Sequence, residues 1–162
     1  MARLKLNPKL DRARRTQLKR AGITCVCYNL RKASRVVTRI FDQHLEEAGM
    51  SSTQFQILAA IARHDTLSIS QLAELMLMDR TTLTRNLKPL EKSRWIRHAD
   101  EDEDRRRRSV QLSAAGDRAL EKALPLWEKA QEDVLARAGD ENTKALLVNL
   151  WRFIYGKRYL GA

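Results

Sequence analysis

Two short helical patterns that follow each other closely constrain this fold more than any other feature of the sequence. The first runs from Gln71 to about Leu77, and Ser70 is expected to be its N-cap. The second begins after Asp79, another residue type that favours the N-cap position. Its apolar side chains recur every three or four residues, at Leu83, Leu87 and Leu90. Two short helices joined by so brief a turn, the second strongly amphipathic, are typical of a helix-turn-helix.

The periodicity changes from helical to extended directly after this second helix. Residues 95–98 and 109–112 are predicted to be strands, and the second alternates clearly between apolar and polar side chains. Between them lie five consecutive acidic residues, 100–104, followed by four arginines, 105–108. A charged loop between two strands, directly after a helix-turn-helix, is typical of a wing. Residues 51–113 are therefore expected to form a winged helix-turn-helix domain.

Helical patterns flank this domain on both sides. A helix is expected over residues 23–48 with Gly49 as its C-terminal cap. Ser51 and Gln54 have the spacing of a capping box that opens the next helix, whose apolar face is Phe55, Leu58, Ile61 and Ala62. After the wing, helices are expected over residues 114–137 and 141–159. The predicted fold is thus mainly α with a small β-hairpin wing, embedded in a helical dimerisation region formed by residues 21–50 and 114–162.

The last of these helices is apolar over more than one face. A chain of 162 residues has little left to cover it, so a partner subunit is the simplest cover and a homodimer is expected. The candidate dimerisation residues are Trp127, Leu147, Leu150, Trp151, Phe153, Ile154 and Tyr155.

The formal net charge is +11, and much of it belongs to residues 1–20, which hold eight Lys and Arg and one acidic residue. This segment is expected to be a flexible basic arm. It either adds phosphate contacts and reaches a groove, or it is a solvated tail that keeps the protein soluble. Such a charge suggests a polyanionic partner.

The helix after Asp79 carries the main candidates for contact with DNA. Its polar face holds three basic residues and no acid, and its short threonines let the backbone come close to a ligand. Arginine can donate two hydrogen bonds to guanine in the major groove, and threonine suits phosphates or the thymine methyl. An ordinary polar surface helix is the alternative. The candidates in the two helices are Ser70, Gln71, Arg80, Thr81, Thr82, Thr84, Arg85 and Lys88.

The wing contains residues that phosphate would repel and residues that it would attract. A hairpin lets the acidic limb turn to solvent while arginines reach the narrow minor groove, where the negative potential is strongest. Asp104 can pair with Arg106 and hold its guanidinium in place. A solvated charged loop is the alternative. The candidates here are Asp104, Arg105, Arg106, Arg107 and Arg108.

Several other classes of protein are disfavoured by the sequence. No apolar run is long enough to span a bilayer and no signal peptide is recognisable, so a cytoplasmic protein is expected. The three histidines stand at no chelating spacing, so neither a metal nor a cofactor is expected. There is no glycine-rich phosphate loop and no serine or cysteine beside a plausible histidine base, so the protein is not expected to be an enzyme.

These features together resemble the MarR family of prokaryotic transcription regulators. The resembling segments are residues 72–75, 79–91, 95–96, 104–106, 110–113 and Gly116. The resemblance implies a triangular homodimer with residues 80–88 in the major groove and Arg106 in the minor groove, held by Asp104. It also implies binding to a pseudo-palindromic operator, commonly as a repressor that a small phenolic or other apolar effector releases. Ser93 and Arg94 stand where the family usually has a glycine before the first wing strand.

Two alternatives to an effector-controlled regulator stay open. In the peroxide-sensing branch of the family a cysteine lies in the first helix, and Cys27 falls close to that register, with Cys25 nearby. The supporting tyrosines of that branch appear here as Arg31 and Phe41, and a small residue in helix packing is the commoner role of such a cysteine. The second alternative is a winged-helix module that binds RNA or a protein.

Overall fold

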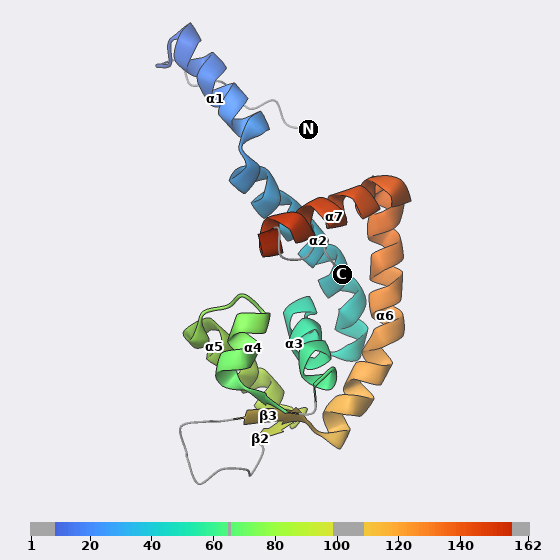
Figure 1. The fold of residues 1–162 in the computed structure, drawn as a ribbon. Coiled ribbons are helices and arrows are strands. Elements are labelled where there is room, and N and C mark those ends of the chain that lie inside the picture. The colour runs from blue at the N-terminus through green and yellow to red at the C-terminus, as the bar shows by residue number, and fades with distance from the viewer. Residues whose placement is uncertain (1–8, 65, 99–108, 157–162) are drawn as a thin grey trace. The chain divides into compact units, whose positions relative to one another are not determined.

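A computed structural model describes residues 9–64, 66–98 and 109–156 of the chain, and it is mainly helical (Figure 1). In chain order its elements are α1 (Arg12–Thr24), α2 (Val26–Leu45), the 3-10 helix η1 (Glu46–Ala48), α3 (Ser52–Ala62), β1 (Leu67–Ser68), α4 (Ile69–Leu75), α5 (Arg80–Lys92), β2 (Ile96–His98), β3 (Ser109–Leu112), α6 (Ala114–Ala138) and α7 (Asp140–Tyr155). The chain divides into two compact units, one ending at Arg39 and the other beginning at Ile40. The predicted fold class, mainly α with a small antiparallel sheet, is confirmed.

The first unit begins with a helix where the sequence predicted a flexible arm. The side chain of Asp11 accepts a hydrogen bond from the backbone N–H of Arg14 at 2.8 Å, which caps the start of α1. The helix ends at Cys25, where the backbone is extended with ψ of 108°. Residues 12–20 are therefore helical where a flexible segment was expected, while residues 1–8 lie outside the described residues.

The core of the second unit lies among α3, α4, α5, the small sheet and the first half of α6. The largest fully buried side chains are Leu45, Ile57, Leu58, Ile61, Leu72, Leu83, Leu87, Leu90 and Val110. The predicted apolar face of α5 is thus confirmed, as is most of the face predicted for α3, although Ala62 is exposed. Ser51 and Gln54 form the predicted capping box, and Gly49 has the left-handed φ of 69° expected of a C-cap.

The sheet has three strands rather than the predicted two. All pairs are antiparallel, in the order β1-β3-β2, with Leu67 opposite Val110 and Ile96 opposite Leu112. The short strand β1 directly precedes α4, so the sheet joins the helix-turn-helix to the root of the wing.

Helix α4 begins two residues earlier than predicted. Ser68, not Ser70, is the N-cap: its hydroxyl accepts the backbone N–H of Gln71 at 3.2 Å. The side chain of Gln71 in turn accepts the backbone N–H of Ser68 at 2.9 Å, which completes a capping box. Ser70 is an exposed residue of the first turn.

The two last helices meet at Gly139, as predicted. Ser113 caps α6, and its hydroxyl accepts the backbone N–H of Gly116 at 3.0 Å. Helix α7 ends at Tyr155, earlier than the predicted Tyr159, because Gly156 follows as a C-cap with a positive φ of 62°.

Candidate nucleic-acid interface

The start of α5 is fixed by hydrogen bonds between Asp79 and Thr82. One carboxylate oxygen of Asp79 accepts the backbone N–H of Thr82 at 2.8 Å, and the other accepts its hydroxyl at 2.6 Å. These bonds hold the pKa of Asp79 below its ordinary value, since they favour the charged carboxylate. The predicted N-cap is confirmed, and the buried leucines on the opposite side determine which face of α5 is exposed.

The exposed face of α5 is polar and basic. Arg80, Arg85 and Lys88 are exposed, and no ion pair found among the described residues involves any of them. Thr81 and Thr84 are exposed as well, while Thr82 is half-buried against Asp79. The hydroxyl of Thr84 donates to the carbonyl oxygen of Arg80 at 2.7 Å, so only its lone pairs remain for a ligand. The helix runs through Pro89 and ends at Lys92.

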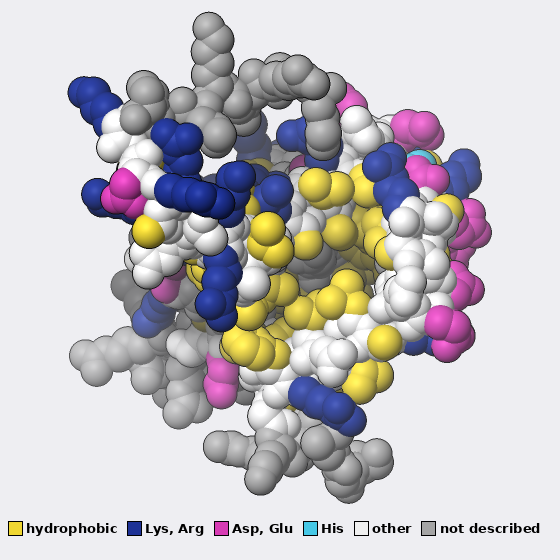
Figure 2. Space-filling model, turned by 90° about the horizontal axis from the view of Figure 1, so that it is seen from above, with side chains coloured by type: hydrophobic (Ala, Val, Ile, Leu, Met, Phe, Trp, Pro, Cys, Tyr) yellow, Lys and Arg dark blue, Asp and Glu magenta, His cyan; other side chains and the backbone are white. Residues whose placement is uncertain are grey.

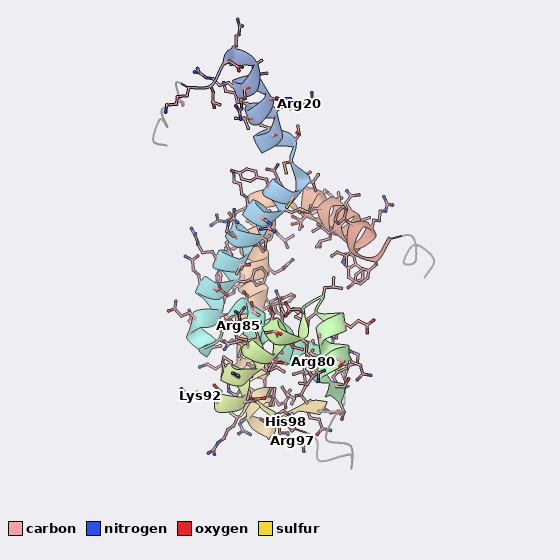
Figure 3. All side chains as sticks on the ribbon, turned by 90° about the vertical axis from the view of Figure 1, so that its left-hand side faces the viewer. Arg20, Arg80, Arg85, Lys92, Arg97 and His98 are labelled. Atoms are coloured by element: carbon pink, nitrogen blue, oxygen red, sulfur yellow. The ribbon has the colours of Figure 1, made fainter. Side chains whose placement is uncertain are left out.

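Between the end of α5 and the end of β2, the chain carries further exposed polar side chains that sequence reasoning missed. Lys92, Arg94, Arg97 and His98 are exposed, and Figure 3 places Lys92, Arg97 and His98 in one view with Arg80 and Arg85. The imidazole Nε2 of His98 lies 3.2 Å from a carboxylate oxygen of Glu91, which links β2 to α5. Arg97 and His98 were considered only as part of the first predicted strand, residues 95–98, and not as candidates for contact with DNA. The predicted wing residues 104–108 lie outside the described residues.

The two turns that flank α5 each contain a non-glycine residue in the left-handed region. Leu77, between α4 and α5, has φ of 50°, and Arg94, between α5 and β2, has φ of 56°. Arg94 occupies the turn at which the sequence departs from the family's glycine. The backbone of this turn is left-handed, as it would be with glycine, although glycine would adopt this conformation at lower free energy. The residue type therefore differs from the family's glycine, but the backbone conformation does not.

Most of the predicted dimerisation residues form an apolar surface on α7. Phe153 is 75% exposed, Trp151 52% and Ile154 48%, values far above those of a protein core. Figure 2 shows apolar side chains gathered on the face seen from above. Leu147 and Tyr155 are exposed as well, whereas Leu150 is half-buried. Trp127 differs from the rest: its ring stacks on Phe55 at 6.0 Å within the second unit, so it packs in the core of its own subunit.

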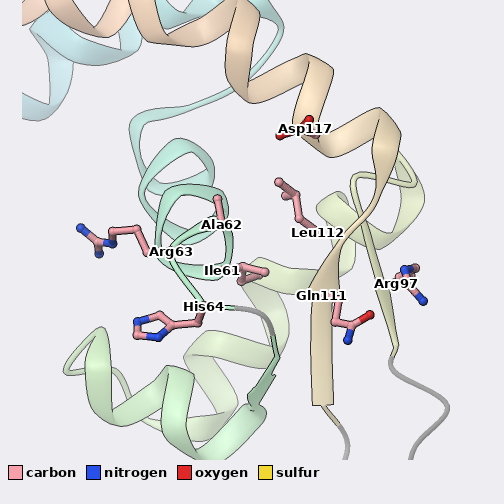
Figure 4. A pocket seen from close by; sticks show the side chains of 8 residues that line it. All are labelled: Ile61, Ala62, Arg63, His64, Arg97, Gln111, Leu112 and Asp117. Carbon is pink, nitrogen blue, oxygen red and sulfur yellow. The ribbon is translucent and has the colours of Figure 1, made fainter.

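The described residues of the second unit line a more apolar cavity and a polar one. The more apolar one, of about 400 Å³, lies between α3, the end of α4 and α6, and its lining residues are Phe55, Gln56, Ala59, Arg63, Met76, Leu124 and Trp127. The other, of about 290 Å³, is polar and lies between the end of α3, the sheet and α6 (Figure 4). There Arg63 and His64 point away from Arg97, so the cationic groups do not converge on one ligand position.

Both cysteines are exposed thiols of the first unit. Cys25 lies between α1 and α2, and its sulfur accepts the backbone N–H of Tyr28 at 3.5 Å. Within the described parts of the chain, no group of three metal-ligating side chains occurs. None of the described helices is both long and apolar enough to cross a membrane.

A helix-turn-helix followed by a small antiparallel sheet, with a basic second helix, defines a winged helix-turn-helix protein. The model of the MarR family matches residues 48–107. The chain is 35% identical to the transcriptional regulator MosR of M. tuberculosis, covering 83% of this chain and 98% of that one with a TM-score of 0.68. The chain therefore belongs to the MarR family, which confirms the predicted class of DNA-binding transcription regulators.

Two further comparisons agree. The chain is 30% identical to the transcriptional regulator SarZ of Staphylococcus epidermidis over 56% of its own length, and this match spans 62% of SarZ. An E. coli MarR mutant solved with operator DNA has the same fold, with a TM-score of 0.74 at 18% identity over 83% of this chain and 96% of that one. MosR and SarZ are both named as transcriptional regulators.

Proposed function

We propose that this protein is a sequence-specific repressor that binds a pseudo-palindromic DNA operator as a homodimer. The observation that carries the proposal is the exposed face of α5, on which Arg80, Arg85 and Lys88 stand beside short threonines and opposite a buried leucine face. A helix of this kind fits the major groove, and its arginines have the geometry to donate two hydrogen bonds to guanine. MosR, the 35% identical relative, has been solved in complex with DNA.

The dimer follows from the exposed apolar residues of α7. Moving apolar side chains as large as Trp151 and Phe153 out of water is favourable. A second copy of the chain is therefore expected to cover them. Dimerisation would place two copies of α5 about one helical turn of DNA apart, ~34 Å, which is the spacing of operator half-sites. Arg106, held by Asp104, and its neighbouring arginines are expected to reach the minor groove.

The apolar cavity supports control by a small apolar or phenolic effector. Phe55 and Trp127 offer aromatic faces, and Arg63 offers a cation at the rim for an acidic or hydroxyl group of the ligand. Met76, which also lines this cavity, is the C-cap of α4. A ligand in this cavity would therefore contact the helix-turn-helix directly, at the end of α4. A relative by fold, BpsR of Bordetella bronchiseptica, is named as regulated by 6-hydroxynicotinic acid.

Selection of bound duplexes from a random DNA pool tests this function. We expect an inverted repeat with half-sites one turn apart, together with a dimer by mass measurement at the same concentration. Loss of the repeat when an aromatic acid is added would support release by an effector. If no sequence is enriched, the proposal of an operator-reading repressor is wrong, and a winged-helix module for RNA or protein takes its place.

Control by oxidation is the second candidate, favoured by the position of Cys25. The thiol of Cys25 is exposed directly before α2, and its sulfur accepts the backbone N–H of Tyr28 at 3.5 Å, so an oxidant in solution can reach it. Peroxide treatment should then abolish operator binding, and replacing Cys25 and Cys27 by serine should make binding insensitive to peroxide. A wild-type protein that binds equally well after treatment contradicts this candidate. In either case we expect a cytoplasmic protein without catalytic activity.

A further inference from the structure

The first unit is far more basic than the rest of the protein. Residues 9–39 contain ten Lys and Arg and one acidic residue, Asp11. Six of the exposed bases form a set that we call the basic ridge: Arg12, Lys19, Arg20, Arg31, Arg35 and Arg39. Figure 3 labels Arg20, which projects outward from α1.

On α2 the basic ridge is separate from the apolar face. Arg31, Arg35 and Arg39 are four residues apart, so they lie on one side of the helix. Leu30 and Val37 lie on the other side by the same geometry. Burial of the apolar face in a dimer therefore leaves these three arginines available.

Helix α1 has an N-cap from Asp11, but packing contributes little to its stability. It buries no side chain, and a helix of 13 residues without packing is marginal in water. Arg12 and Arg15, and Arg15 and Lys19, have the spacing at which like charges destabilise a helix. A polyanion would remove this repulsion.

The junction between α1 and α2 is braced rather than loose. The side-chain amide of Asn29 donates to the carbonyl oxygens of Ile23 and Cys25, both at 2.9 Å. The last turn of α1 is thereby tied to the first turn of α2. The two helices that carry the basic ridge are therefore joined by hydrogen bonds at their junction.

A second copy of the chain offers little net negative charge on the helices α6 and α7. Residues 109–156 hold seven acidic and six basic residues, so the charges of α6 and α7 nearly cancel. Duplex DNA carries one negative charge per ~1.7 Å of its axis. We propose that the basic ridge is a second DNA-binding surface, which binds duplex phosphates without regard to sequence and independently of α5.

The test uses the full-length protein and random-sequence duplex. Arg80→Gln and Arg85→Gln together remove the two arginines of α5, and this parent variant should still bind with a steep dependence on salt. Adding Arg31→Gln, Arg35→Gln and Arg39→Gln should make the slope of log affinity against log salt shallower by ~2–3, since each lost phosphate contact contributes ~0.9. Glutamine keeps helix propensity close to that of arginine.

A matched control removes the same charge elsewhere. Arg118→Gln, Lys122→Gln and Lys129→Gln, all exposed on α6, should leave the slope of the parent unchanged. Circular dichroism and dimer mass check that each variant folds and associates like the parent.

Equal slopes for the ridge variant and the control variant would overturn the inference. So would retained DNA binding by the ridge variant together with lost binding to phosphatidylglycerol vesicles, because the ridge would then serve a membrane. The inference does not depend on operator reading. Failure to enrich an operator contradicts only the proposed repressor, whereas this slope is measured on random DNA.

Discussion

Gly116, in the first turn of α6, lies directly against the backbone of Trp95. A Cβ atom on Gly116 would overlap the carbonyl oxygen of Trp95, and the same oxygen accepts the backbone N–H of Ser113 at 3.0 Å. The start of α6 and the residue before β2 are therefore in backbone contact, and only glycine leaves room for it.

Replacing Gly116 by alanine should lower the free energy of unfolding by about 2–3 kcal/mol. The new Cβ would overlap backbone atoms of Trp95, which cannot move aside as the end of a flexible side chain can. Urea unfolding of the dimer at fixed concentration measures this. Gly22→Ala is the control: no atom lies within 4 Å of a Cβ there, and alanine is the better helix former, so stability should stay equal or rise. Equal stability of the Gly116 variant and wild type would contradict the packing described here.

Ser68→Ala should lower the free energy of unfolding by about 1 kcal/mol, because the N-cap hydrogen bond to Gln71 is lost. Ser70→Ala, two residues along, should leave unfolding within about 0.5 kcal/mol of wild type, since Ser70 is exposed. If Ser70 contacts a phosphate, that variant should instead weaken DNA binding. If Ser70→Ala were instead the less stable variant, Ser70 rather than Ser68 would be the N-cap of α4.

The hydrogen bonds to Asp79 make the start of α5 sensitive to acid. The folded-state pKa of Asp79 lies below its ordinary value of 3.8, so its stabilising contribution is fully present above that value. The contribution is lost as the pH falls through the lowered pKa. Asp79→Asn keeps a capping side chain that does not titrate, so its unfolding midpoint should fall less steeply with acid than that of wild type. Parallel pH profiles of the two proteins would count against this role.

Arg94→Gly should raise the free energy of unfolding by about 1 kcal/mol, because the residue has φ of 56° and glycine adopts that region without steric strain. Arg97→Gly, in the adjacent strand, serves as a control and should be destabilising. A destabilised Arg94 variant would mean that the arginine side chain makes a contact worth more than the strain.

Arg85→Ala should weaken operator binding by about 1–3 kcal/mol and relax the preference at one base pair, if the guanidinium reads a base. Binding to random duplex should change much less. Titration of both duplexes at one salt concentration gives the specificity ratio. An unchanged ratio assigns Arg85 to phosphate contact and leaves base reading to its neighbours on α5.

The parts of the fold that depend on local signals could be predicted from the sequence. Asp79, Gly49 and the pair of Ser51 and Gln54 act within one helical turn, so their patterns were sufficient. Ser68 could have been found too, because Ser68 and Gln71 have the spacing of a capping box. Ser70 was preferred because it stands closer to the apolar pattern of α4.

The parts that depend on distant partners could not be predicted in this way. Strand β1 has two residues, and it exists because Leu67 pairs with Val110, far along the chain. The stacking of Trp127 on Phe55 could not be predicted, because α6 and α3 meet only in three dimensions. In α1 the dense basic charge favoured an arm, and the cap supplied by Asp11 was overlooked.

The hydroxyl of Ser113 connects the turn before β2 to the first turn of α6. It donates to the carbonyl oxygen of Arg94 at 2.6 Å and accepts the N–H of Gly116. With 25 residues, α6 is about 37 Å long, so a tilt of roughly 5° about Ser113 moves its far end by about 3 Å. If α6 tilts about Ser113 as one rigid rod, a displacement of a few ångströms where α6 meets α7 corresponds to a small rotation at Arg94.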